Sequence, residues 1–157
     1  MQLTEEQMKF VEANMATIGY MMANYKEFGE DALKVASDYF YELGKTIGKN
    51  TKQKMNITES DVNAVTKVVS AVLEQATGIV PEIKVEEDRA VFVNEGFCPV
   101  MEAVKLLNAP WDKVCHNYSL RWFEGVAAGV NPNVKMEVPE TRIKGEKCCR
   151  HIFTVPK

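Results

Sequence analysis

The chain has 157 residues, of which 46% are hydrophobic and 26% charged, and its formal net charge is −3. This length and balance predict one globular domain, residues 1–157, that can bury a core of its own. Because the charge is slightly negative and no long basic run occurs, a nucleic-acid-binding or anionic-membrane-binding role is disfavoured.

No membrane-spanning segment is predicted, because the longest weakly charged stretch, residues 10–25, is interrupted by Glu12, Asn14 and Asn24. The acidic N-terminal residues differ from a signal peptide. We therefore expect a cytoplasmic protein whose thiols are kept reduced. Its four cysteines are expected to be buried, metal-bound or reactive rather than paired in disulfides.

Residues 1–80 are predicted to form a helical scaffold. Thr4 and Gln7 match a capping box at the first helix start, and a second capping box at Thr58 predicts the start of the third helix. Gly48 and Gly78 are the expected ends of the second and third helices. The expected helix ranges are 4–27, 30–48 and 58–77.

Apolar residues recur at intervals of three or four along the first helix: Met8, Val11, Met15, Ile18, Met22 and Tyr25. Such a seam normally packs a helix against its own chain. Because unbranched methionine adapts to many partners, the alternative is that this seam forms the interface of a homodimer, which is the expected assembly.

Residues 81–157 are predicted to carry the functional site on a β-β-α-α-β-β unit. Alternating apolar residues predict antiparallel strands at 82–86 and 89–94. Pro99 and Pro110 begin two helices, and residues 134–155 have the pattern of a closing hairpin. The predicted fold class is α+β, with N-terminal helices and a four-stranded, mainly antiparallel sheet that has two helices inserted between its hairpins. The two inserted helices are expected at 99–108 and 110–129.

Thiol, imidazole and indole groups are all confined to residues 97–153. They are Cys98, Cys115, Cys148, Cys149, His116, His151, Trp111 and Trp122. Any cysteine, histidine or metal chemistry must therefore take place in the second half of the chain.

Side-chain periodicity assigns these residues to faces. Along the last strand, Cys149 and His151 share one face, while Cys148 lies on the other. On the helix before it, Cys115 and Trp122 belong to one aromatic stripe that is expected to face the interior.

A shared pocket is predicted because consecutive elements usually pack together. It would combine Cys115 with Cys149 and His151, and Cys98 would enter at a helix N-terminus that lowers its pKa. The structural alternative is that these cysteines and the aromatic stripe only fill the core. His116 is expected to be a partly buried core histidine. The cysteine spacing lacks the close pairs of a zinc ribbon, so the metal signal is weak.

Three short motifs in this half resemble the L-2-amino-thiazoline-4-carboxylic acid hydrolase family. They are Phe97-Cys98-Pro99, Cys115 within the next helical stretch, and the turn Gly145-Glu146-x-x-Cys149. That family is in turn similar to the 4-vinyl reductase domains, whose α+β fold is shared with trafficking-complex subunits and is often dimeric. Some relatives hold zinc through cysteines, but Thr141 here replaces one of these, so His151 or an acidic residue would have to complete the set.

The leading functional hypothesis implied by the resemblance is a hydrolase acting on a C–N bond of a small amino-acid-like heterocycle. Its candidate catalytic residues are Cys115, Cys149 and His151, and its candidate substrate-binding residues are Cys98, Trp122 and Arg121, the last as a carboxylate clamp. In an alternative role, Cys98, Cys115, Cys149 and His151 would bind a metal, with zinc as the cofactor. The alternative functions are a non-catalytic small-molecule or metal-binding module of the 4-vinyl reductase type, and a purely structural dimer.

Overall fold

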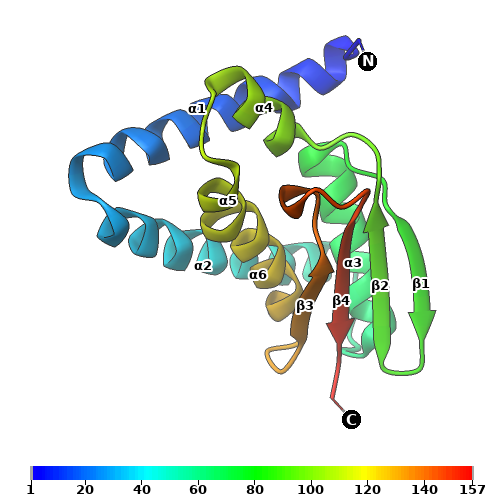
Figure 1. Ribbon diagram of the computed structural model, residues 1–157. Coiled ribbons are helices and arrows are strands. Elements are labelled where there is room, and N and C mark those ends of the chain that lie inside the picture. Colours follow the sequence, from blue (N-terminus) through cyan, green and yellow to red (C-terminus); the bar gives the residue numbers. More distant parts are fainter. Residues whose placement is uncertain (1, 157) are drawn as a thin grey trace.

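The computed structural model describes residues 2–156 and contains helices on one side of a four-stranded sheet (Figure 1). The N-terminal helices are α1 (Glu5–Phe28), α2 (Glu30–Lys54) and α3 (Val62–Thr77). Strands β1 (Glu82–Glu86) and β2 (Arg89–Asn94) follow, then α4 (Pro99–Leu107), α5 (Trp111–Val114), η1 (Cys115–Ser119), α6 (Leu120–Val130), β3 (Lys135–Glu140), η2 (Arg142–Lys144) and β4 (Cys149–Thr154). This order confirms the predicted α+β fold. In the described part of the chain, no helix is both long and apolar enough to cross a bilayer.

The sheet has the strand order β1-β2-β4-β3, and all neighbouring strands are antiparallel. Both predicted strands of the first hairpin have the expected limits. The central pair, β2 and β4, aligns Phe92 with His151 and Asn94 with Cys149. One face of this pair packs on α3 and α6, with Phe92, Phe123 and Phe153 in the shared core. The opposite orientation of β2 and β4 therefore brings the end of β2 beside the start of β4.

Helices α2 and α6 cross at close range through glycines. Gly48 was expected to end the second helix, but α2 continues to Lys54. The reason is that Gly44 and Gly48 are buried against α6, where added Cβ atoms would overlap the backbone oxygens of Trp122 and Val126. Gly48 is therefore a packing residue and not a helix terminator.

The predicted capping box of α1 is confirmed, since Thr4 and Gln7 exchange hydrogen bonds of 3.0 and 3.1 Å. The predicted start of α3 at Thr58 is wrong. Asp61 caps this helix instead, and its carboxylate accepts a 2.9 Å hydrogen bond from the backbone N–H of Ala64. Aspartate is among the strongest N-cap residues, so it competes with the earlier threonine.

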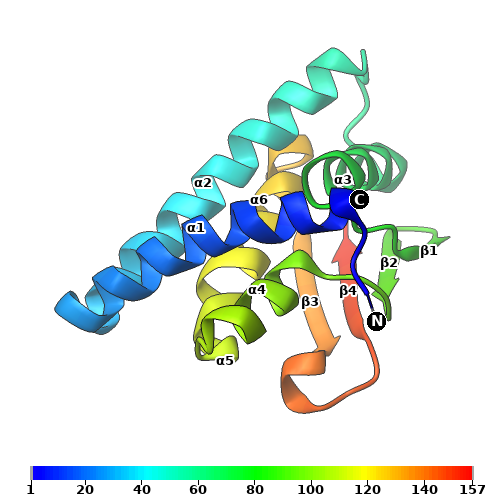
Figure 2. The same ribbon diagram turned by 90° about the horizontal axis from the view of Figure 1, so that it is seen from above.

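The apolar seam of α1 packs inside its own chain. Val11 and Ile18 are fully buried, and Met15 and Met22 are half-buried against a core cluster that includes α4 residues. Figure 2 shows α1 lying alongside α4 and approaching α2 at the far end of the molecule. The seam is thus part of the core, and the expected homodimer remains a prediction that needs another surface.

Candidate active-site cavity

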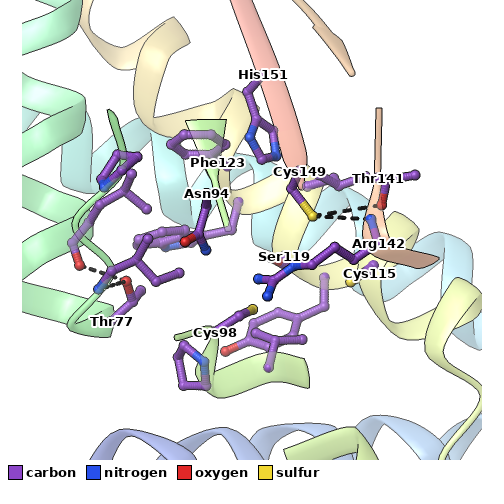
Figure 3. A pocket seen from close by; sticks show the side chains of 18 of the residues that line it. Thr77, Asn94, Cys98, Cys115, Ser119, Phe123, Thr141, Arg142, Cys149 and His151 are labelled. Atoms are coloured by element: carbon purple, nitrogen blue, oxygen red, sulfur yellow. Dashed lines mark hydrogen bonds between the residues drawn. The ribbon is translucent and has the colours of Figure 1, made fainter. Parts of the chain in front are cut away.

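A cavity of about 270 Å³ lies where the start of α4, η1, the end of β2 and the start of β4 meet (Figure 3). Most of its lining is apolar. Five of the residues expected at a shared site line it: Cys98, Cys115, Trp122, Cys149 and His151. The N-terminal half also contributes to its walls, through Asn14, Ile47 and Leu73 among others.

The helix that carries Cys115 is not continuous. Between α5 and α6, residues Cys115–Ser119 form a π-helical turn, in which the backbone N–H of Leu120 donates to the carbonyl oxygen of Cys115. One residue is thus inserted into the helical repeat, and Cys115, Tyr118 and Ser119 all line the cavity. Such turns occur frequently at functional sites.

Cys149 differs from the other thiols in its hydrogen bonds. Its half-buried Sγ accepts the backbone N–H of Arg142 at 3.5 Å and lies 3.9 Å from Oγ1 of Thr141. These contacts connect the first residue of β4 to the turn that precedes it. They hold the sulfur in place at the start of β4, where Cys149 lines the cavity.

The two other thiols in the cavity are held neutral. Burial raises the pKa of Cys115 to about 12, an effect larger than the lowering caused by Trp111 and Arg142. Burial also raises the pKa of Cys98, which outweighs the backbone N–H groups at the start of α4. The expectation that the helix N-terminus lowers the pKa of Cys98 is therefore wrong, because desolvation is the larger effect.

His151 is a neutral imidazole at physiological pH. Burial lowers its pKa to about 4, and its ring packs edge-on against Phe123 with centroids 4.7 Å apart. The ring points into the cavity on the same side of β4 as Cys149 (Figure 3). The pair expected from strand alternation thus faces one cavity.

Cys148 points away from the cavity, as its strand position predicts. Its thiol donates a 3.2 Å hydrogen bond to Glu140, a carboxylate that Arg150 also contacts at 2.8 Å. That bond to Glu140 raises the pKa of Cys148.

Two other expectations need correction. Arg121 does not line the cavity; it pairs with Glu124 and stacks 4.6 Å from the ring centre of Tyr41, so it is not placed to clamp a bound carboxylate. His116 is exposed rather than part of the core, and its Nδ1 lies 2.7 Å from the carbonyl oxygen of Asp112.

Sequence reasoning missed Arg142 as a site residue. This side chain lines the cavity, and its Nη1 donates to the carbonyl oxygen of Gly96 at 2.8 Å. The only signal in the sequence was its position in the turn that leads to Cys149. Nothing in the sequence indicated that this turn folds over the pocket.

The site does not fit the metal implied by some relatives. Across residues 2–156, no three Cys, His, Asp or Glu side chains are grouped closely enough to hold an ion. Cys98, Cys115, Cys149 and His151 thus share a cavity without forming a ligand set, and zinc enters no step of the chemistry below.

The family model for L-2-amino-thiazoline-4-carboxylic acid hydrolase matches residues 9–153. The chain belongs to this family. The match extends well beyond the motifs of the second half and includes nearly all of α1 as well as α2 and α3. No curated protein matches this family member significantly in sequence.

Among solved structures, this family member resembles a trafficking protein particle complex subunit 3 from Naegleria fowleri. That subunit was crystallised covalently bound to palmitic acid. The TM-score is 0.65 at 11% sequence identity, and the similarity covers 96% of each chain. At this identity the comparison establishes a shared fold.

Proposed function

We propose that this protein is a hydrolase that opens a small amino-acid-like heterocycle, of the 2-amino-thiazoline-4-carboxylate type, at a C–N bond. The family membership supports this substrate class. The observation that carries the proposal is Cys149, whose sulfur faces the cavity, accepts the backbone N–H of Arg142, and shares a strand face with the neutral His151.

In the proposed reaction, the sulfur of Cys149 bonds to the ring carbon that carries the amino group, the ring C=N double bond gives its electron pair to the ring nitrogen, and His151 takes the thiol proton. As the adduct collapses, the exocyclic amino nitrogen re-forms a C=N double bond and releases a proton, the ring C–N bond breaks, and the released nitrogen takes up both that proton and the proton from His151. Water then adds to the same carbon, and Cys149 leaves as a thiol. One water molecule is consumed and no other reactant is needed. Because burial lowers the pKa of His151 to about 4, the imidazole is a weak base that holds the thiol proton only briefly and returns it readily to the released nitrogen.

The other lining residues would shape the cavity in this scheme. Cys98 and Cys115 remain protonated at neutral pH, because burial raises the pKa of both. Because burial disfavours the thiolate form of both, these two residues only line the cavity, and Cys149, which shares a strand face with the proton acceptor His151, is the nucleophile. Trp122 contributes an apolar surface for the ring.

The test is incubation of the purified chain with L-2-amino-2-thiazoline-4-carboxylate, followed by mass spectrometry for the product that has gained one water. We expect Cys149→Ser to lose at least about 100-fold in kcat/KM, since the nucleophile is removed. Cys148→Ser is the matched control, one residue away on the opposite face, and should keep its activity. Absence of turnover by the parent, or equal losses in both variants, would refute the proposal.

A second candidate function is a non-catalytic module that binds an apolar ligand. It is favoured by the mostly apolar lining of the cavity and by the shared fold with a subunit that is covalently bound to palmitic acid. The same purified protein would then bind palmitate, measured by native mass spectrometry, and leave the amino-thiazoline unchanged. Turnover of the heterocycle together with no palmitate binding would exclude this alternative.

A further inference from the structure

The cavity contains a cation without a counter-ion. Among the described residues that line it, none is Asp, Glu or Lys, and Arg142 is the only one with a permanent charge. Within residues 2–156, no carboxylate lies at ion-pair distance from that guanidinium. Arg142 is half-buried and its Nη1 donates to the backbone carbonyl oxygens of Glu95 and Gly96, so an anion bound in the cavity would supply the negative charge that the protein does not.

Two unpaired donors also lie in this cavity. Among the described residues, the buried side-chain nitrogens that make no hydrogen bond of normal geometry are Nε1 of Trp111, which is close enough to the Cys115 thiol to lower its pKa, and Nε of Arg142; both residues line the pocket. Buried donors in folded proteins are nearly always satisfied. A ligand with acceptor oxygens would satisfy both.

The remaining contacts of Arg142 hold it in position. Its Nη1 donates to the carbonyl oxygen of Gly96 at 2.8 Å, in the loop before α4. The side chain reaches into the cavity between Cys149 and Cys98 (Figure 3). One nitrogen is therefore fixed by the protein, while Nε stays unpaired.

We propose that Arg142 is the anion anchor of this cavity: its guanidinium binds the carboxylate of the ligand, with the Trp111 indole N–H as a second donor. This inference takes its ligand class, a small carboxylate, from the proposed function, and it adds Arg142 as the residue that selects the carboxylate. Arginine suits this role because its planar donors match the two oxygens of a carboxylate. A carboxylate on Arg142 would hold the rest of a small ring beside Cys149.

The experiment uses isothermal titration calorimetry on the full chain to compare ligands that carry a carboxylate with neutral counterparts that do not. One pair is 2-aminothiazole-4-carboxylate and 2-aminothiazole, in which an aromatic thiazole replaces the reactive thiazoline ring. The second pair is octanoate and octanol. We expect the parent to bind the anionic member of at least one pair about 10- to 100-fold more tightly, as for a charge-assisted hydrogen bond.

Variants separate anchoring from a structural role. Arg142→Gln should lose the preference for the anion while it still binds the neutral analogue; a general collapse of the loop would weaken both members equally. Arg142→Lys keeps the positive charge but loses the planar pair of N–H donors, and should keep part of the preference for the anion. Arg121→Gln is the matched control outside the cavity and should leave the preference unchanged.

The outcomes distinguish this inference from the proposed function. Equal affinity of the parent for charged and neutral members, or no binding of any of them, would overturn the anchor. The anchor would equally be overturned if the Arg142→Gln variant retained the full preference. Carboxylate-selective binding without turnover of the thiazoline would support the anchor and refute only the hydrolase.

Discussion

At the scale of single residues, desolvation sets the charge states of several side chains that line the cavity. Burial raises the pKa values of Cys98 and Cys115 and lowers the pKa of His151, so all three stay uncharged near neutral pH. Among the described lining residues, Arg142 is the one that carries a permanent charge. An apolar enclosure with one fixed cation favours a small anionic ligand.

The stability of the fold should decrease in mild acid because of His151. In the unfolded chain the imidazole of His151 has its ordinary pKa of 6.5, whereas in the folded chain burial lowers this pKa to about 4. Between these pH values only the unfolded state binds this proton, so protonation lowers the free energy of unfolding. The loss is nearly zero above pH 6.5 and grows as the pH falls toward 4; at pH 5.5 it is about 1 kcal/mol. Urea unfolding of the parent and of His151→Phe, at pH 7.5 and 5.5, measures this difference. Phe is suitable because it keeps an aromatic ring against Phe123.

The control for that measurement is His116→Gln, which alters the exposed histidine. We expect the parent and the control to lose the same stability between the two pH values, and His151→Phe to lose about 1 kcal/mol less. An identical pH dependence in all three proteins would contradict a buried, neutral His151.

At the scale of elements, the sequence predicted features that depend on neighbouring residues better than features that depend on contacts between distant segments. Strand alternation correctly put Cys149 and His151 on one face, because the period of two is built into a strand. The role of Gly48 depends on the facing helix, and the position of Arg142 depends on how its turn folds over the cavity. The π-helical turn at Cys115 likewise has no signal in residue periodicity.

The glycine crossing of α2 and α6 gives a prediction at this scale. Gly44→Ala and Gly125→Ala each place a Cβ against the backbone of the other helix, so each should lower the free energy of unfolding by about 1–3 kcal/mol or more. Gly19→Ala in α1 is the control, because a Cβ there comes within 4 Å of no described atom other than those of its chain neighbours and its own helix backbone. That variant should gain about 0.5–1 kcal/mol from helix propensity. If chemical denaturation gave the same change in the free energy of unfolding for all three variants, this would argue against a close crossing of α2 and α6.

At the scale of the whole molecule, an apolar groove of about 780 Å³ runs between α1 and α2. Four of its side chains are largely exposed: Tyr20 at 75%, Phe28 at 66%, Val35 at 70% and Tyr39 at 60%. Contiguous exposed apolar surface of this kind often marks an interface. Because the methionine seam is inside the fold, this groove is the surface that suits the predicted homodimer better.

We expect the parent to be a dimer in size-exclusion chromatography with light scattering, and Val35→Glu to shift it toward the monomer. The variant introduces a charge at an exposed position, so the monomer should still fold. Val80→Glu is the control, because Val80 is 76% exposed and lies outside the groove. A monomeric parent would end the dimer prediction, as would a Val35→Glu variant with unchanged mass.

Both the proposed reaction and the anion anchor require that substrate binds in the cavity between α4, η1 and the sheet. A crystal structure of the protein with 2-aminothiazole-4-carboxylate would locate the ligand. We expect its carboxylate on the guanidinium of Arg142 and the ring carbon that bears the amino group next to Sγ of Cys149. Ligand density in the α1–α2 groove, or in the cavity with its carboxylate turned away from Arg142, would show that this assignment of the site is wrong.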